Sequence, residues 1–274
     1  MADLIIGENG NLVRQDIISQ DKGYGTSSRY VSIQTKDVMD IITEIEPGAE
    51  ITGWVNSNVR KKEKESFQRH AMMVRMPNSE LIPGVHSNLV IFNSSDRSSA
   101  LKMYSGAFRA VCSNGIVFAD TGEALSELSI RHTNKDWKSL VYDLLRDYAK
   151  NQEEQRQMIM SMQEKQMSYE DMGKLSERVA EEILNPMITG TVIDPMQLMI
   201  SKRKEDSGKN LWTVFNRLQE HLLQGGITRI IEKVEEDDTQ ARLIEIESNT
   251  HKISDPQKQI KVNRQLHSMI MELV

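Results

Sequence analysis

The segment from Phe92 to Phe118, FNSSDRSSALKMYSGAFRAVCSNGIVF, constrains the fold most, because it joins a run of small polar residues to a helix-like apolar pattern and the chain's single cysteine. The serines around Asp96 are typical of a turn that can cap a helix. We predict a helix over residues 99–111, because apolar side chains recur there at helical spacing: Leu101, Tyr104, Phe108 and Val111. Residues 112–115 should end that helix, and residues 116–118 are predicted to be a short buried strand.

The residues before this segment predict one helix and three strands. Residues 35–45 place their aliphatic side chains on one side, which is typical of a short amphipathic helix that ends before Pro47. Residues 51–59 and 67–76 alternate in polarity as the two strands of a hairpin, and residues 89–92 continue as a third strand after a turn over 77–84. We therefore predict an α+β fold, with an antiparallel sheet and covering helices in the N-terminal half.

After Asp120 the pattern changes to long helices that begin near residues 137, 169, 211 and 255. We predict two domains, an α+β domain over 1–125 with a basic β-hairpin and a mainly helical region over 126–274. Trp212, Phe215 and Asn216 are predicted to pack in the core. Asn216 must then find hydrogen-bond partners or face a groove, because an unpaired buried amide is costly.

Composition excludes several classes of protein. The chain of 274 residues is 38% hydrophobic and 27% charged, and no apolar run approaches the ~20 residues of a membrane span. The N-terminus lacks the pattern of a secretory signal, so we expect a cytoplasmic protein. One cysteine forbids an internal disulfide, and Cys112 is predicted to be a buried structural residue. No nucleotide-binding, hydrolase or metalloprotease motif is present, and we expect no enzyme activity, cofactor or metal site.

The charge is unevenly distributed along the chain. The formal charge is −5 for residues 1–50, +5 for residues 51–119 and −6 for residues 120–274. The predicted hairpin concentrates the cations, and an exposed Trp54 on its outgoing strand would offer a ring for an unpaired base. The predicted nucleic-acid-binding residues are Trp54, Asn56, Arg60, Lys61, Lys62, Lys64, Arg69, Arg75, Arg97, Lys102 and Arg109. The alternative interpretation is that the hairpin tip is an ordinary solvated charged loop and that Trp54 packs in the core. A run of charged residues alone is weak evidence for nucleic-acid binding.

Three segments resemble a known family. NSSDRSSA followed by FRAVCSNGIV resembles the signature of the phage/plasmid-like protein family, a domain-of-unknown-function family of prophages and plasmids. Residues 210–220 and 260–273 resemble its Trp-containing helix and its closing helix. The family pattern often has His and Gly in the first motif, where this chain has Ser95 and Arg97. The order of elements also resembles that of Rad52-like single-strand annealing proteins, although no motif matches.

These observations lead to one expected function and two alternatives. We expect a phage or plasmid accessory protein of the bacterial cytoplasm that binds single-stranded DNA and assists recombination or strand annealing as a homo-oligomer. The first alternative is an acidic interaction protein that inhibits a host defence or restriction factor. The second is a hydrolase without a recognised motif, which would need a cleft of perturbed carboxylates.

Overall fold

The computed structural model describes residues 5–6, 13–56, 61–109, 127–185, 191–237, 240–253 and 255–274. The chain divides into two compact units, residues 1–157 and 158–274, and the division falls within helix α4 (Tyr148–Glu164). The fold is α+β, as predicted. Helix α3 (Trp137–Arg146) and the start of α4 belong to the first unit, whereas the sequence pattern assigned them to the second region. No helix among the described residues is long and apolar enough to cross a membrane.

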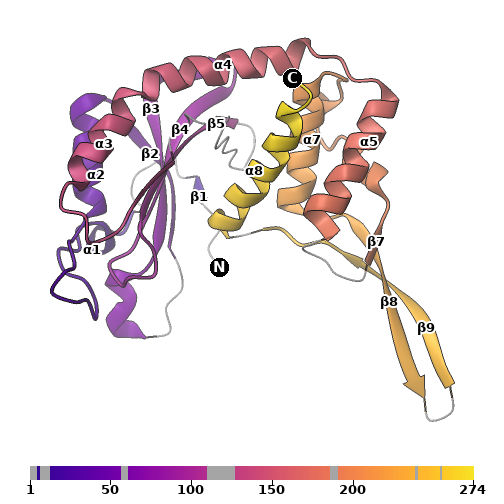
Figure 1. Cartoon of the computed structure of the whole chain (residues 1–274), viewed down its shortest axis with the longest axis horizontal. Helices are drawn as coiled ribbons and strands as arrows, with labels where there is room; N and C mark the ends of the chain where they lie inside the picture. Colours follow the sequence, from indigo (N-terminus) through magenta and orange to yellow (C-terminus); the bar gives the residue numbers. More distant parts are fainter. Residues whose placement is uncertain are drawn as a thin grey trace. The chain divides into compact units, whose positions relative to one another are not determined.

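The first unit is built on a six-stranded antiparallel sheet whose spatial order follows the sequence (Figure 1). The predicted hairpin and third strand are confirmed as the pairing of β2 with β3 and of β3 with β4. The strands are β1 (Ile5–Ile6), β2 (Glu50–Asn56), β3 (His70–Ile82), β4 (Val85–Asn93), β5 (Leu101–Arg109) and β6 (Glu127–Ile130).

One face of this sheet carries the main core. The predicted helix over residues 35–45 is confirmed as α2 (Thr35–Ile45), and it packs with α1 (Gln15–Ile18) and α3 against the sheet. Alternate strand residues such as Leu89, Ile91 and Met103 meet Val38, Ile42 and Val141 from the helices, and all six are fully buried. Each such aliphatic side chain contributes about 1.5–3 kcal/mol by leaving water.

The predicted helix over residues 99–111 is wrong, because residues 101–109 form the strand β5. Strand β5 lies between β4 and β6, and its register sets Leu101 opposite Ile130 and Phe92 opposite Lys102. Both of its faces are largely buried, so apolar residues occur at odd and even positions, and some of them fall at helical spacing by coincidence. Cys112 and the strand predicted over residues 116–118 lie outside the described residues.

The predicted turn over residues 77–84 is also wrong over most of its length. Strand β3 continues to Ile82, and the turn is confined to Pro83 and Gly84, where Gly84 has a φ of 76°. Pairing with β4 is regular up to Arg75 and resumes at Glu80, and Asn78 between them has a φ of 54°. This long irregularity interrupts the alternation by which a strand is recognised in the sequence.

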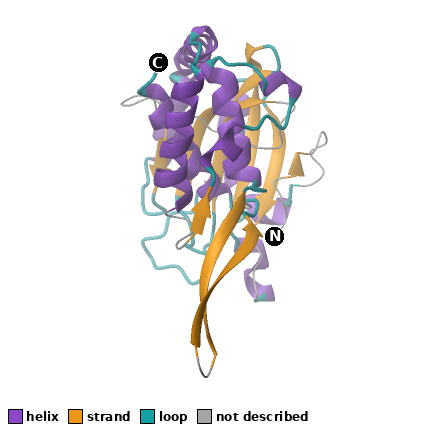
Figure 2. Cartoon of the chain, turned by 90° about the vertical axis from the view of Figure 1, so that its right-hand side faces the viewer, coloured by secondary structure: helices purple, strands orange, loops and turns teal. Residues whose placement is uncertain are grey.

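The second unit combines helices with a three-stranded sheet. The predicted helices near 169, 211 and 255 are confirmed as α5 (Tyr169–Val179), α7 (Leu211–Gln224) and α8 (Pro256–Met271). Each helix has a side-chain N-cap, from Ser168, Asn210 and Asp255 respectively. The sheet consists of β7 (Thr191–Ile193), β8 (Thr228–Asp237) and β9 (Gln240–Asn249), which were not predicted. Strands β8 and β9 form a long ribbon that projects away from these helices (Figure 2).

Candidate nucleic-acid interface

Trp54, the predicted base-stacking residue, is buried in the core. Its side chain is 5% exposed, and its ring stacks on His70 with 4.9 Å between the ring centroids. Register explains the difference, because β2 pairs Ile51 with Val74 but Gly53 with Met73, so one extra residue lies between them. This bulge reverses the alternation and places Trp54 opposite the core residue Met72. Trp54 therefore cannot present its ring to a base in the folded protein.

A buried hydrogen-bond network lies beside Trp54 at the end of the sheet, and it includes the first residue of the NSSDRSSA motif. The amide nitrogen of Asn93 donates to the Ile33 carbonyl at 2.7 Å and to the Thr35 hydroxyl at 3.0 Å. The amide oxygen of Asn93 accepts from the backbone N–H of Ser94 at 2.9 Å and lies 3.0 Å from Nε2 of His132. These contacts fix the orientation of the Asn93 amide, because rotating it would set oxygen against oxygen and N–H against N–H.

This network, which we call the Asn93 network, consists of His70, Thr35, Asn93 and His132. The two histidines lie at its ends. The Thr35 hydroxyl receives a hydrogen bond from Asn93, so it donates to Nε2 of His70 at 2.7 Å, and Nδ1 of His70 donates to the Gln68 carbonyl at 3.2 Å. Burial lowers the pKa of His70 to about 4 and lowers the pKa of His132 below its usual range. Both rings are therefore neutral at pH 7. His70 is engaged at both ring nitrogens, whereas a neutral His132 can donate to only one of its two oxygen partners, the Asn93 amide oxygen or the Val31 carbonyl. Because both rings are buried, the network is a structural centre that fixes the chain around residues 31–35 against the sheet.

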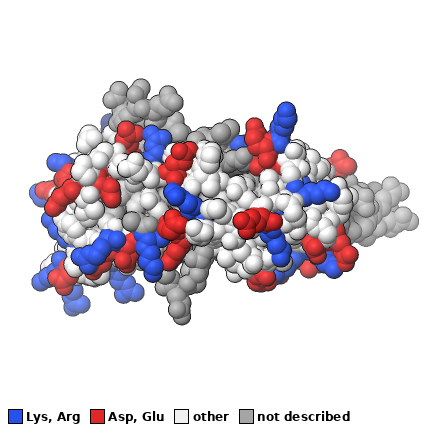
Figure 3. Space-filling view, turned by 90° about the horizontal axis from the view of Figure 1, so that it is seen from above, with Lys and Arg blue, Asp and Glu red and all other residues white. Residues whose placement is uncertain are grey.

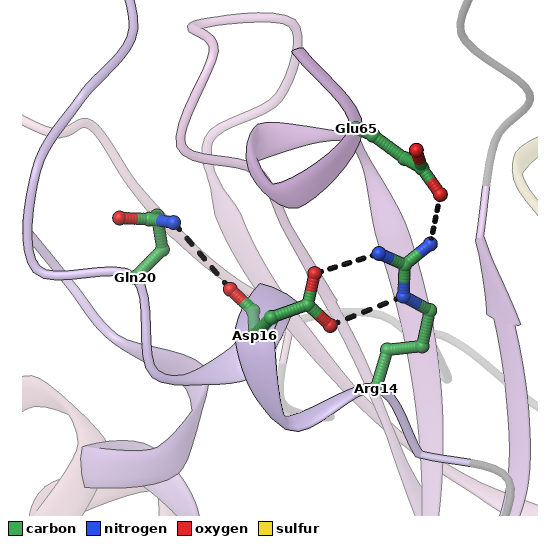
Figure 4. Close-up of polar contacts among 4 residues, drawn as sticks. All are labelled: Arg14, Asp16, Gln20 and Glu65. Carbon is green, nitrogen blue, oxygen red and sulfur yellow. Dashed lines mark hydrogen bonds and ion pairs between the residues drawn. The ribbon is translucent and has the colours of Figure 1, made fainter. Parts of the chain in front are cut away.

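The connection between β2 and β3 is a folded element rather than a free loop. Residues Lys62–Phe67 form a 3₁₀ helix, η2, that packs against α1. The Arg14 guanidinium lies 2.6 Å from the Glu65 carboxylate and 2.6 Å from that of Asp16 (Figure 4). These ion pairs raise the pKa of Arg14. Glu65, one of the two acidic residues within the predicted basic tip, therefore forms an ion pair with Arg14 of the N-terminal arm.

Tyr24, which the sequence pattern did not select, lies where the arm meets this connection. The Nζ of Lys64 is 4.9 Å from the Tyr24 ring centroid, and the ring of Phe67 is 5.5 Å from it. The backbone N–H of Tyr24 donates to the Ser95 carbonyl at 2.8 Å, and the N–H of Ser95 donates to the Phe67 carbonyl at 3.1 Å. The N-terminal arm, the connection between β2 and β3, and the serine motif therefore meet at Tyr24, whose side chain is partly exposed.

Arg97 completes this surface. It is exposed and has a φ of 69°, and its guanidinium lies next to Gly25, where an added Cβ would be 3.5 Å from it. Lys61 and Lys62 are exposed at the start of the connection. We define the Tyr24 surface by one aromatic and four cationic residues: Tyr24, Lys61, Lys62, Lys64 and Arg97. An anion that approaches this ring would meet cations contributed by two separate loops, and also the Glu63 carboxylate, which accepts a hydrogen bond from the Tyr24 hydroxyl at 3.4 Å.

The remaining predicted site residues are dispersed. Arg69 is half-buried just before β3, and Asn56 is half-buried opposite His70. Lys102 is half-buried on β5. Arg75 is exposed and ion-paired with Glu50 at 2.9 Å, and Arg109 lies opposite Val85, far along the sheet from His70. Arg60 lies outside the described residues. The structure thus brings Lys64 and Arg97 to neighbouring residues of the N-terminal arm, Tyr24 and Gly25, with Lys61 and Lys62 exposed in the same connection as Lys64, and it separates Arg75 and Arg109 from them.

A shallow pocket of about 380 Å³ lies at the irregular part of β3. It is lined by residues of both signs, which include Glu50, Arg75, Glu80 and His86. The paired charges leave no dominant field that would favour an anion or a cation. Among the described residues, no three His, Cys, Asp or Glu side chains come together as metal ligands.

The helical surfaces have a different charge pattern from the Tyr24 surface. On the face shown in Figure 3, basic and acidic side chains are interspersed. Ion pairs join successive turns within α4 (Lys150–Glu154) and within α5 (Lys174–Glu170), and another links Arg178 of α5 to Glu182 in the π-helical turn that follows it (Ala180–Leu184). Such exposed pairs are worth about 0.3–0.5 kcal/mol each and leave little net charge for a ligand.

The chain is thus an α+β protein with a buried hydrogen-bond network at one end of its sheet and a surface with several basic residues around Tyr24. The chain belongs to the family described as "Domain of unknown function (DUF932)", whose model matches residues 25–246. It is similar to two proteins of Escherichia coli (strain K12), UPF0380 protein YfjQ and UPF0380 protein YafZ. Each is 27% identical over 218 residues, which is 77% of this chain and 74% of the relative. No solved structure matches the chain. The family assignment from the serine motif is thereby confirmed.

Proposed function

We propose that this chain is a non-enzymatic accessory protein of phages or plasmids that binds single-stranded nucleic acid on the Tyr24 surface. The observation that carries the proposal is the partly exposed Tyr24 ring with the Lys64 ammonium 4.9 Å from its centroid and Arg97 on the adjoining loop. Stacking of an unpaired base on an aromatic ring is worth about 1–3 kcal/mol and does not depend on base identity. Lysines and arginines around the ring would neutralise the flanking phosphates.

Single strands fit this surface better than a duplex. Bases in a duplex are stacked on one another and cannot reach a tyrosine ring, whereas the bases of a single strand are available. The formal charge of the whole chain is −6, so long-range attraction to a duplex is weak. The basic surface is local, which favours a short stretch of flexible backbone. We propose that such binding serves recombination or strand annealing, with several copies assembled along one strand.

The test is fluorescence anisotropy with labelled single-stranded DNA, single-stranded RNA and duplex DNA at two salt concentrations. Tyr24→Ala should weaken single-strand binding roughly 5- to 150-fold, the equivalent of one base stack. Lys61→Gln combined with Lys62→Gln should weaken binding equally for all sequences. The same double variant should flatten the salt dependence by about 0.7 for each phosphate that the lysines neutralise in the wild type. Duplex DNA should bind more weakly than either single strand.

The second unit offers a matched control for the tyrosine. Tyr169 is 73% exposed, and the Nζ of Lys209 lies 3.9 Å from its ring centroid, so it reproduces a tyrosine beside a lysine. Tyr169→Ala should leave binding unchanged. Wild-type affinity and salt dependence in both the Tyr24 and the lysine variants, with folding intact, would remove the proposal. The inhibitor of a host defence or restriction factor would then be the function to test, by binding to candidate host proteins.

A further inference from the structure

The pocket at the irregular part of β3 exists because the two strands of this pair differ in length there. Between the pairs Arg75–Asn88 and Glu80–His86, four residues of β3 stand against one residue of β4. Extra residues in one strand bend it away from its partner, and such bulges are common beside functional sites. Residues 76–79 of the bulge line the pocket of about 380 Å³, together with Gly48 and the residues at the two ends of the bulge.

The hydroxyl of Ser79, one of the residues that line this pocket, lacks a hydrogen-bond partner. Ser79 is 3% exposed, and its Oγ is buried without a partner among the described residues. The residue before it, Asn78, has a φ of 54°, a conformation that few residues other than glycine adopt. A buried hydroxyl without a partner is costly and uncommon in native proteins. A polar molecule in the pocket would supply the missing hydrogen bond.

The two ends of the pocket carry different charged groups. Register places Glu50 opposite Arg75 at one end of the bulge. At the other end it places Glu80 opposite His86. Both pairs lie on the same face of the sheet, because His86 and Asn88, the residue opposite Arg75, are alternate residues of β4. The two pairs are therefore about 7 Å apart along the strand, with a guanidinium at one end and a carboxylate at the other.

Each end retains hydrogen-bonding capacity for a ligand. Arg75 donates from one nitrogen to Glu50 at 2.9 Å, but a guanidinium has further N–H donors, and an exposed ion pair is worth little. One carboxylate oxygen of Glu80 accepts from the backbone N–H of Gly84 at 2.9 Å. The nearby guanidinium of Arg156 donates to the backbone carbonyl of Glu80 at 3.2 Å. The lining residues thus include two carboxylates and one guanidinium, so a ligand with an anionic group must also carry a cationic one.

We propose that this pocket binds a small zwitterion of the α-amino acid class. The carboxylate of the ligand would accept hydrogen bonds from Arg75 and from the Ser79 hydroxyl, and its ammonium group would donate to the Glu80 carboxylate. Both charged groups of an amino acid are attached to one carbon atom, so they fit between the two ends of the bulge. The proposal does not depend on nucleic-acid binding, because the Tyr24 surface adjoins Ser95, beyond the opposite end of β4.

Isothermal titration calorimetry with the full chain tests this site. The probes are the common free L-amino acids and, for the one that binds most tightly, its N-acetyl and carboxamide derivatives. At least one free amino acid should bind saturably. Each derivative lacks one of the two charges and should bind roughly 10- to 150-fold more weakly, because a hydrogen bond between charged groups is lost. A derivative that binds as tightly as the free amino acid would overturn the proposal, and so would the absence of saturable binding by every probe.

Three variants locate the bound molecule. Arg75→Gln and Glu80→Gln should each weaken binding by the same factor of roughly 10 to 150. Ser79→Ala should weaken it by about 2- to 12-fold, the equivalent of one uncharged hydrogen bond. Without ligand, the melting temperature of Ser79→Ala should equal or exceed that of the wild type, because the hydroxyl that is removed has no partner. A serine with a purely structural role would show the opposite pattern, a lower melting temperature and unchanged affinity.

Arg146 provides the matched control for Arg75. It is exposed and pairs with Asp143 at 3.3 Å on α3, so Arg146→Gln removes the same charge from the same unit without altering the pocket. Its affinity for the amino acid should equal that of the wild type. Melting curves show whether each variant is folded. Wild-type affinity in folded Arg75→Gln or in folded Glu80→Gln would contradict the assignment of the two charged ends.

Discussion

Two buried asparagines, one in each unit, lie in opposite hydrogen-bonding environments. The amide of Asn93 has partners on both its nitrogen and its oxygen, at distances of 2.7–3.0 Å. Asn216 on α7 is 4% exposed, and its amide nitrogen and oxygen have no hydrogen-bond partner among the described residues. Both residues are nearly inaccessible to water, so burial is not what distinguishes them. Asn93 therefore stabilises its unit, whereas the unpaired amide of Asn216 lowers the stability of its unit.

The environment of α7 explains how its unit tolerates this cost. Residues 211–223 of α7 are all buried, so the helix has no polar face on which an amide could reach water. Several of its polar residues have a partner in a neighbouring segment: Arg217 donates to the Gly208 carbonyl at 2.8 Å, and Gln219 donates to Asn263 at 2.6 Å. Asn216 is the exception, at the position where the sequence predicts either hydrogen-bond partners or a groove. Its two atoms are buried without partners rather than directed into a groove.

The largest effect should come from removing the ring that covers the Asn93 network. Trp54→Ala should lower the free energy of unfolding by about 3–5 kcal/mol, because a large side chain in contact with His70 would leave a cavity. Trp54→Phe retains an aromatic ring and should cost much less. Chemical denaturation measures both, and a fully stable alanine variant would show that Trp54 does not support this region.

Removing the central amide of the network should be the next largest effect. Asn93→Leu leaves the Ile33 carbonyl and the Ser94 N–H buried without partners and should cost about 3 kcal/mol of unfolding free energy. Hydrogen exchange should rise at residues 31–35, which the network fixes to the sheet. An equal loss in Asn93→Leu and Asn216→Leu would contradict the comparison between the two asparagines.

Acid should weaken the same region through its histidines. The pKa of His70 is lowered by burial to about 4, so between pH 6.5 and pH 4 the unfolded chain binds a proton that the folded chain does not. The stability contributed by neutral His70 is therefore complete above pH 6.5 and is lost as the pH falls toward 4, by about 2–3 kcal/mol. The lowered pKa of His132 acts in the same direction.

Denaturation curves across this pH range measure the effect of His70. His70→Gln should flatten the dependence, because glutamine does not titrate. An unchanged slope in that variant would assign the acid sensitivity to other groups.

The smallest effect, and the one of opposite sign, is expected at the unpaired amide. Asn216→Leu removes two buried polar atoms that have no partner and replaces them with apolar atoms of similar volume. It should leave the free energy of unfolding unchanged or raise it by about 1 kcal/mol. Asn263→Leu is the matched control, because Asn263 accepts a hydrogen bond from Gln219 and its loss should be destabilising. A large loss of stability in Asn216→Leu would show that the Asn216 amide does have hydrogen-bond partners, and would contradict the comparison with Asn93.

Local sequence rules determined the elements whose periodicity and end signals agree. Helix α2 was predicted with its bounds, since Val38, Ile41 and Ile42 share one face and a proline follows. Helices α5, α7 and α8 were predicted from stripes that follow Ser168, Asn210 and Asp255, the residues that cap them. These features are set within a few turns of chain, so no distant contact was needed to find them.

Tertiary structure decided whatever depends on a partner strand. Trp54 lies in the core rather than on the free face because β2 contains one extra residue. Residues 101–109 form β5 rather than the predicted helix, and burial on both faces of the strand explains the apolar pattern that suggested a helix. Tyr24 gained its setting from Lys64 and Ser95, which are remote in sequence, so no local pattern could have selected it. The charge of the basic segment and the caps of the helices can be recognised without any knowledge of distant contacts. Only the pairing of distant strands decided which of those residues face solvent, because a shift of one position in register exchanges the two faces of a strand.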